Sequence, residues 1–538
     1  MRIGLITGRK ASELVKRFAE LAEKKVVGAE LEVIVIPINV IGLVNTDAIA
    51  SIIASNEQLA RKLRENDVIL VPGTVRGDVS VIEKVVGKPV YKASRSVSLL
   101  TEVVKSLLSG VSLSKTLPAE DVLKDCLLRR IASALERFSR EAICVFSVGG
   151  LKVPLRGPPI LLAAETSVSL PPEKAGEQAK YFEESGADIV VIGIPLGESR
   201  DVYTRRIKSV TSNCNRAVIA VDSENPHAII EGFKHGAEMA FGLHAGNMDI
   251  LREYRKKTFV VIPGNTKTGV LPRNSKETVE MLMKNLKKAR KLGYEKLIAD
   301  PVLQPPLMGL VDSIVAYKEL SDKLSVPLAL STSNVTELLD ADSVGVNALL
   351  SCIAVELGAS LVHVSEESWR ARWSVSEVKL GLLLACAARD LHQFPVDVGI
   401  DLFVAKEKEK PEPPTINWKE PGEKEVIDTR SIGQLKAKLD KWGHVVIEVD
   451  HDEKVIIVCI EKHMGESRKC YIGDDATKLM RKVLNDHREF SIEHAGYLGM
   501  ELAKAMIALK LGKKYVQDSD VIETPFEKYF IIKKRYNF

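Results

Sequence analysis

Acidic and amide side chains recur in the middle of the chain, each at the end of a short apolar run. Asp222, Asp300 and Asn334 are the clearest examples. A carboxylate can accept two parallel N–H···O bonds, which are strong and geometrically selective, and an amide can both donate and accept. These side chains would suit the N–H edge of a guanidine-like heterocycle. The structural alternatives are a turn or helix cap for Asp300, the N-cap of the next helix for Asp222, and a local cap for Asn334.

A second group of strand-end residues could contact an anion or a metal. Arg200, His363 and Lys267 are candidates for an anion such as a diphosphate, by charge and hydrogen bonding. Glu165 could contact a metal or a substrate, since carboxylates are hard oxygen ligands. Amides and hydroxyls accompany the acids, so no protein metal site is predicted. Alternatively, His363 is a satisfied core histidine, Lys267 a surface lysine, and Glu165 a carboxylate paired inside the protein.

Eight short apolar runs divide the segment 158–392, with helical stretches such as 172–185 and 275–292 between them. Runs that are apolar throughout are typical of parallel strands buried on both faces. Eight strand–helix units of this total length predict a (β/α)8 barrel, whose chemistry sits at the carboxyl ends of the strands. The predicted strands are 159–164, 188–193, 217–222, 238–243, 258–263, 296–300, 327–331 and 360–365.

Further blocks flank the barrel segment. Residues 1–145 alternate strands with helices and predict a Rossmann-like α/β domain. Residues 406–424 are charge and proline with little to bury, and predict an exposed linker. Residues 425–538 hold a charged helix (431–441), two strands and two further helices, and predict a small α+β domain. The expected fold class is α/β: a central (β/α)8 TIM barrel with an N-terminal Rossmann-like domain and a C-terminal α+β domain.

The composition argues against several kinds of partner. The chain has 538 residues, with 76 Lys and Arg against 72 Asp and Glu, a formal net charge of +4. This near balance, without a dense basic run, argues against nucleic acid. The longest strongly apolar run, 380–388, is far shorter than the roughly 20 residues that span a bilayer. The amino-terminal sequence reaches charged residues too early for a secretory signal. We expect a soluble, cytoplasmic protein without a membrane partner.

The cysteines carry no recognisable pattern. There are seven, an odd number, and no Cys-x-x-Cys pair occurs. This argues against both a disulfide framework and a zinc cluster. We expect small core residues of a reducing compartment.

Several strand-end motifs resemble those of the dihydropteroate synthases. The sequence Gly-Ala-Asp-Ile-Val-Val-Ile-Gly at 186–193, with Gly-Glu-Ser-Arg at 197–200, is similar to their second-strand motif. Ala-Val-Asp-Ser at 220–223 is similar to the third-strand motif. Ala-Asp-Pro at 299–301 resembles the sixth-strand motif, and Leu-Val-His-Val at 361–364 resembles the eighth. The three-block layout resembles the archaeal dihydropteroate synthase-related proteins.

The resemblance covers roughly 158–392 and implies a pterin ligand and a reaction. That reaction condenses a dihydropterin-methyl diphosphate with an arylamine in folate or methanopterin biosynthesis, with Mg²⁺ accompanying the diphosphate. The pterin and the arylamine would be small-molecule partners, and a homodimer is a further expectation. The residues placed at the pterin are Asp222, Asp300, Asn334 and Glu165, and those placed at the diphosphate are Arg200, His363 and Lys267.

Three departures from the synthase pattern keep other functions open. Ser333-Asn334 stands where the synthases have Ser-Arg-Lys, and it resembles the Ser-Asn of the pterin-binding methyltransferases. Ala-Glu165-Thr is nearer the Gly-Glu of those methyltransferases. The fourth-strand asparagine of the synthases falls near Phe241-Gly242 and is lost. The alternatives are methyl transfer from a methyl-tetrahydropterin to a corrinoid or thiol acceptor, and a non-catalytic pterin-binding protein.

Overall fold

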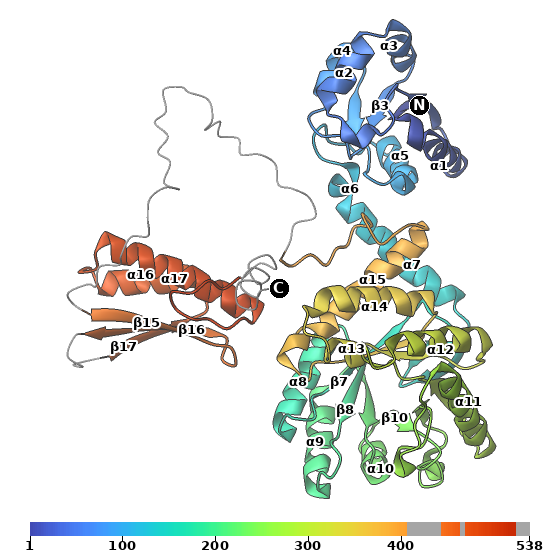
Figure 1. Cartoon of the computed structure of the whole chain (residues 1–538), viewed down its shortest axis with the longest axis vertical. Coiled ribbons are helices and arrows are strands. Elements are labelled where there is room, and N and C mark those ends of the chain that lie inside the picture. Colours follow the sequence, from blue (N-terminus) through green and yellow to red (C-terminus); the bar gives the residue numbers. More distant parts are fainter. Residues whose placement is uncertain (406–442, 463–467, 523–538) are drawn as a thin grey trace, which may run out of the picture. The chain divides into compact units, whose positions relative to one another are not determined.

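The structure is a computed structural model that describes residues 1–405, 443–462 and 468–522 (Figure 1). By its internal contacts the chain divides into two units, Met1–Pro411 and Glu412–Phe538. The predicted linker at 406–424 and the predicted helix at 431–441 lie outside the described residues.

A four-stranded parallel sheet with helices opens the first unit. Its elements are β1 (Arg2–Thr7), α1 (Ser12–Lys25), β2 (Glu30–Val35), α2 (Thr46–Ala54), α3 (Glu57–Arg64), β3 (Val68–Val71), α4 (Ser80–Val86), β4 (Val90–Lys92) and α5 (Leu100–Leu108). The strand order is β2-β1-β3-β4. Ile49 of α2 and Ile82 of α4 lie in one apolar cluster, and Ala19 of α1 and Val103 of α5 lie in another. Helices therefore cover both faces, as a Rossmann-like domain requires.

An eight-stranded parallel sheet follows helices α6 (Ala119–Val122) and α7 (Lys124–Glu141). Its strands are β7 (Leu161–Glu165), β8 (Ile189–Gly193), β9 (Val218–Asp222), β10 (Met239–Leu243), β11 (Thr258–Val261), β12 (Lys296–Ala299), β13 (Ala329–Ser331) and β14 (Leu361–Ser365). The order is β12-β11-β10-β9-β8-β7-β14-β13. A parallel bridge between Ala299 and Leu328 joins the two edges, and Ala299 N–H donates to Pro327 O at 2.8 Å. The predicted barrel is confirmed.

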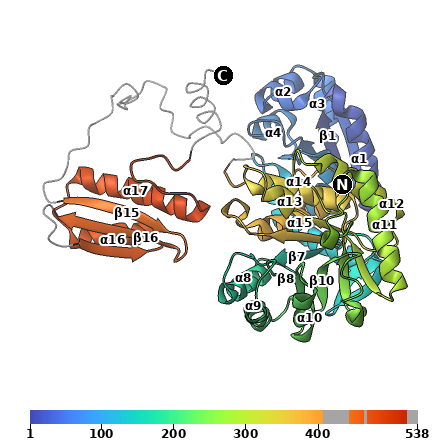
Figure 2. The ribbon, with the colours of Figure 1, turned by 60° about the horizontal axis from the view of Figure 1, so that its bottom comes forward.

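Helices surround these strands (Figures 1 and 2). They are α8 (Pro172–Glu184), α9 (Arg200–Asn213), α10 (Pro226–Lys234), α11 (Ser275–Lys291), α12 (Leu310–Lys323), α13 (Ser333–Thr336), α14 (Ser343–Glu356) and α15 (Ser374–Leu391). Their starts are encoded locally: proline occupies the first position of α8 and α10, and asparagine side chains cap α10 and α11,.

A hairpin that the sequence did not predict closes the amino-terminal end of the barrel. Strands β5 (Cys144–Val148) and β6 (Leu151–Pro154) pair antiparallel. Val148 and Val153 of the hairpin lie in one apolar cluster with Ile189 and Met239, the first residues of β8 and β10. The apolar filling therefore occupies that end, and the polar strand ends open at the other.

The described residues of the second unit form a three-stranded antiparallel sheet with two helices, which confirms the predicted α+β class. Its elements are β15 (Gly443–Asp450), β16 (Val455–Lys462), β17 (Arg468–Gly473), α16 (Ala476–Asp486) and α17 (Ile492–Leu511). Leu479 and Leu502 of the helices share an apolar cluster with Ile456 and Val458 of the central strand. The sequence had predicted only the first two strands.

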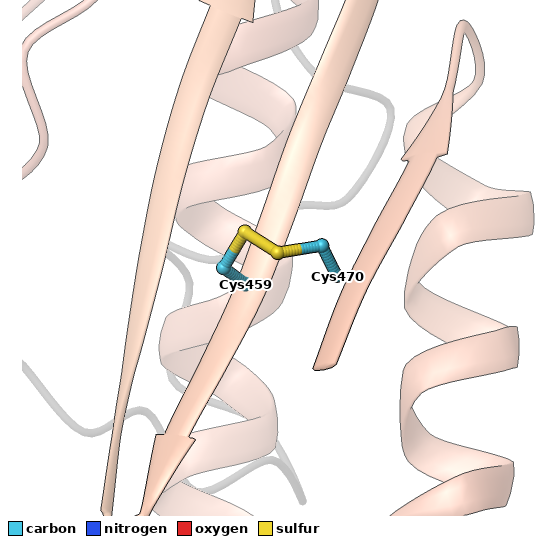
Figure 3. Close-up of a disulfide and its surroundings, with 2 residues drawn as sticks. All are labelled: Cys459 and Cys470. Atoms are coloured by element: carbon cyan, nitrogen blue, oxygen red, sulfur yellow. A yellow bond between two sulfur atoms is a disulfide. The ribbon is translucent and has the colours of Figure 1, made fainter. Parts of the chain in front are cut away.

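One cysteine prediction is wrong. Cys459 and Cys470 form a disulfide (Figure 3). They stand directly opposite each other on β16 and β17, with Cα atoms 4.1 Å apart. The third strand creates this pairing, and because that strand was not predicted, the separation of 11 residues carried no signal.

Candidate functional site

Four of the predicted residues come together at the carboxyl ends of the barrel strands. Glu165 ends β7, Asp222 ends β9, Asp300 directly follows β12, and His363 lies in β14. His363 Nε2 lies 3.0 Å from Glu165 Oε2, and His363 Nδ1 lies 2.9 Å from Ser331 Oγ. The charges of Glu165, His363 and Asp300 all act on the Asp222 carboxyl group. We call these three carboxylates and the histidine the mouth cluster.

Burial and mutual repulsion shift the ionisation of the mouth cluster. Burial raises the pKa of Asp222 to about 7, and the charge of Glu165 adds to this while that of His363 opposes it,. Burial also raises the pKa of Asp300. The pKa of His363 is raised, because its contact with Glu165 and the charges of the two aspartates outweigh the opposing effect of burial. The cluster therefore holds exchangeable protons near neutral pH.

The Asp300 carboxylate is held by its own loop and by helix α12. Oδ1 accepts hydrogen bonds from Tyr317 Oη at 2.6 Å and from Val302 N–H at 2.8 Å. The second bond closes a turn directly after the strand, so the turn predicted as an alternative is present. Val302 adopts φ +67°, the left-handed region, which is a strained conformation for a β-branched residue,. Oδ2 has no hydrogen-bond partner among the described residues.

Asn334 and Asp222 likewise present oxygen atoms. Asn334 lies in α13, where its Nδ2 donates to Leu303 O at 2.8 Å, so its amide oxygen remains available within the described chain. The Asp222 carboxylate makes no hydrogen bond to a described residue. The alternative of Asp222 as a helix cap is wrong, because Asn225 caps α10 by accepting from His227 N–H at 3.0 Å.

The predicted anion-binding residues do not converge in the same way. Arg200 is the first residue of α9, and its side chain is 72% exposed, with Nη2 3.3 Å from Glu231 Oε2. The backbone of Lys267 lies in the short helix η5 (Thr266–Thr268), and its side chain lies outside the described part of the structure. His363 is buried, with Nε2 3.0 Å from Glu165 Oε2.

Phe241 stands where the synthases' fourth-strand asparagine was expected. It lies opposite Asp222 in the register of β10 and β9, and its ring centroid is 5.1 Å from that of His363. An apolar ring therefore takes this place beside the mouth cluster.

The described ranges contain neither a metal-binding group of side chains nor a membrane-spanning helix. No group of three or more His, Cys, Asp or Glu side chains there is placed to hold a metal ion. No helix among these residues is long and apolar enough to cross a membrane.

Comparison with known proteins places the whole chain. It is 30% identical over 533 residues to the uncharacterized protein MJ0107 of Methanocaldococcus jannaschii. The matched region covers 97% of this chain and 99% of that protein. The chain belongs to the family of this archaeal protein. Residues 439–518 match the family described as PterinBD-DUF4346. The sequence-based resemblance to archaeal dihydropteroate synthase-related, pterin-binding proteins is confirmed at the level of the family.

The chain is also distantly similar to solved structures of dihydropteroate synthases. Xanthomonas albilineans dihydropteroate synthase with 4-aminobenzoic acid is 17% identical, with a TM-score of 0.38, over 46% of this chain and 99% of that chain. The Thermus thermophilus enzyme in complex with 6HMPPP is 19% identical, with a TM-score of 0.34, over 41% and 92%.

Tyr317 and Val302 are site residues that sequence reasoning missed. Tyr317 lies 17 residues after Asp300 along the chain, on the buried face of α12. A tyrosine among the small or apolar residues of that face was the available signal, because a buried phenol needs a hydrogen-bond partner. Nothing in the sequence marked Val302, since its positive φ is visible only in the backbone.

Proposed function

We propose that the barrel mouth binds the 2-amino-4-oxopyrimidine edge of a pterin, and that the protein is a dihydropteroate synthase-like transferase. One observation carries the proposal: Asp222, Asp300 and Asn334 each keep an oxygen acceptor that no described residue engages, and the described bonds of Asp300 and Asn334 are internal. The pterin edge offers adjacent N–H donors, and bonds from such donors to a carboxylate are charge-assisted. The mouth and the ligand edge are therefore complementary in hydrogen bonding.

In the first candidate reaction, the amine nitrogen of an arylamine attacks the methylene carbon of a dihydropterin-methyl diphosphate. The C–O bond breaks, diphosphate leaves with the electron pair, and the amine nitrogen loses a proton. The mouth would hold the pterin in place for this attack, and the ionised Asp222 carboxylate, with its pKa of about 7, would accept the proton that the amine loses. No group of His, Cys, Asp or Glu side chains among the described residues is placed to hold Mg²⁺, which would enter with the diphosphate.

A second candidate reaction is methyl transfer from a methyl-tetrahydropterin. It is favoured by the position of Asn334 and by the charge of the mouth, where three carboxylates gather around His363. A diphosphate requires compensating cations, whereas a methyl-pterin carries no diphosphate. The third candidate function for the same site is pterin binding without catalysis.

Calorimetric titration with a dihydropterin tests the shared step. Asp300→Asn should weaken binding by on the order of 2–4 kcal/mol, because one acceptor becomes a donor and a charge-assisted bond is lost. Asn334→Ala should cost roughly 0.5–1.5 kcal/mol, as expected for a neutral bond. Asp312→Asn is the matched control, since Asp312 is exposed on α12. No binding by the wild-type protein would overturn the assignment.

Product assays then separate the reactions. Release of diphosphate in the presence of an arylamine supports condensation. Transfer of a methyl group to a thiol or corrinoid acceptor supports the second candidate, and tight binding with neither product supports the third.

A further inference from the structure

Tyr317 and the turn at Val302 act together on the two side chains that face the proposed pterin edge. Tyr317 is fully buried, and its hydroxyl donates to Asp300 Oδ1. Val302 N–H donates to the same oxygen, and the next residue, Leu303, accepts from Asn334 Nδ2. One short segment and one phenol therefore fix which atoms of both side chains remain available.

These contacts fix which hydrogen-bonding atoms of Asp300 and Asn334 are presented to a ligand at the barrel mouth. A carboxylate can rotate and an amide can flip, so neither group alone dictates what it recognises. Here two donors hold Oδ1 of Asp300, which leaves Oδ2. The Leu303 carbonyl takes one of the two amide N–H groups of Asn334, which fixes the orientation of the amide and leaves its oxygen available. Strained backbone such as that of Val302 persists where its surroundings fix it, and it concentrates at functional sites,.

We propose that Tyr317 is a positioning residue that fixes the Asp300 carboxylate through Oδ1, and that with the Val302 turn it makes the mouth select heterocycles by an edge composed of N–H donors. This inference rests on the proposed pterin binding and adds the group that sets its specificity. Tyr317 acts through Asp300 and needs no contact with the ligand.

The substitution Tyr317→Phe tests the positioning role, with Tyr294→Phe as the matched control. Both tyrosines are buried in the barrel unit, and both hydroxyls donate at 2.6 Å, but Tyr294 Oη bonds to the carbonyl of Met248 rather than to the mouth. In titrations with a dihydropterin, Tyr317→Phe should bind about ten- to a hundredfold more weakly. Tyr294→Phe should bind as the wild type does.

The pH dependence of binding gives a readout that a purely structural role would not move. Binding requires the ionised Asp300 carboxylate, so affinity should fall as the pH drops through its pKa. The Tyr317 hydrogen bond lowers that pKa against the effect of burial, and the charge of His363 from β14 acts in the same direction. Asp222 on β9 is the other titrating group nearby. Removing the phenol hydroxyl should therefore move the acid limb of the affinity profile to higher pH.

A ligand comparison on the wild-type protein keeps the test independent of variant folding. Lumazine carries a 2-oxo group in place of the 2-amino group, which puts an acceptor against the acceptors of the mouth. It should bind at least a hundredfold more weakly than the matching pterin. Equal affinity for the two ligands, or unchanged affinity and an unchanged pH profile in folded Tyr317→Phe, would overturn the inference while pterin binding stood. Absence of pterin binding by the wild type would instead remove the proposed function and this inference with it.

Discussion

Asp222 should destabilise the folded protein at neutral and alkaline pH, and replacing it should reveal this. Its pKa rises from an ordinary value of 3.8 to about 7 in the folded chain. Between these values the folded protein binds more protons at this site than the unfolded chain does. The free energy of unfolding must therefore fall as the pH rises through this window.

The size of the effect follows from the same shift. Each pKa unit corresponds to about 1.4 kcal/mol, so linkage through this one group gives a loss of roughly 2–3 kcal/mol between pH 5 and pH 8. The side chain is only partly shielded from solvent, so we expect about 2 kcal/mol,. In Asp222→Asn this loss disappears. Urea unfolding at both pH values should show the stability of the variant, relative to wild type, improving by about that amount at pH 8.

The comparison between two pH values isolates the ionisation. Any fixed effect of the new amide is the same at pH 5 and pH 8 and cancels. Asp201→Asn, which alters an exposed aspartate at the start of α9, should show no such pH-dependent gain. A stability difference between Asp222→Asn and wild type that stays constant from pH 5 to pH 8 would refute the reasoning. The same variant should bind a dihydropterin more weakly, since an acceptor is lost.

Three further predictions concern the rest of the chain. Arg200→Ala should leave dihydropterin affinity within twofold of wild type, because this side chain is largely exposed and its described ion pair is with Glu231 rather than with the mouth cluster. A tenfold loss in titration would contradict this. Replacing Cys459 and Cys470 by alanine should lower the unfolding free energy of the second unit by about 3 kcal/mol, from loss of the 11-residue cross-link,; equal denaturation midpoints would count against the bridge. Limited proteolysis should cut first within 406–424, and a first cut inside 158–392 would show that the predicted linker is misplaced.

The barrel could be predicted from the sequence because its strands are buried on both faces. Continuous apolar runs such as 188–193 leave few other folds, and polar residues fall at their carboxyl ends by topology alone. The hairpin 144–154 could not be predicted in this way, because the glycine pair at 149–150 marks its turn but not its packing against the amino-terminal end of the barrel. The third strand of the second unit, β17, was not predicted either, and without it the disulfide between Cys459 and Cys470 could not be predicted.

The sequence predicted which residues gather at the candidate site, but not how their side chains are oriented. Strand-end position singled out Asp222, Asp300, Glu165 and His363, and the structure brings them together. Arg200 satisfied the same rule, yet the side chain at the first position of a helix can face outward. Rotations of single side chains decide such cases, and a pattern of residue types contains no information on them.

The charge of the mouth bears directly on the choice between the two reactions. Three carboxylates surround one histidine, so a diphosphate placed among them would be repelled unless cations came from the rim or with the substrate,. Lys267 is the predicted rim cation whose backbone lies in the loop after β11. If condensation is the reaction, Lys267→Ala should reduce turnover with the diphosphate substrate far more than it reduces affinity for the free pterin. If methyl transfer is the reaction, that substitution should leave both the pterin affinity and the methyl transfer rate unchanged, because this reaction releases no anionic leaving group that a lysine would stabilise. Measuring both quantities on one variant therefore separates the two reactions that share this pterin site.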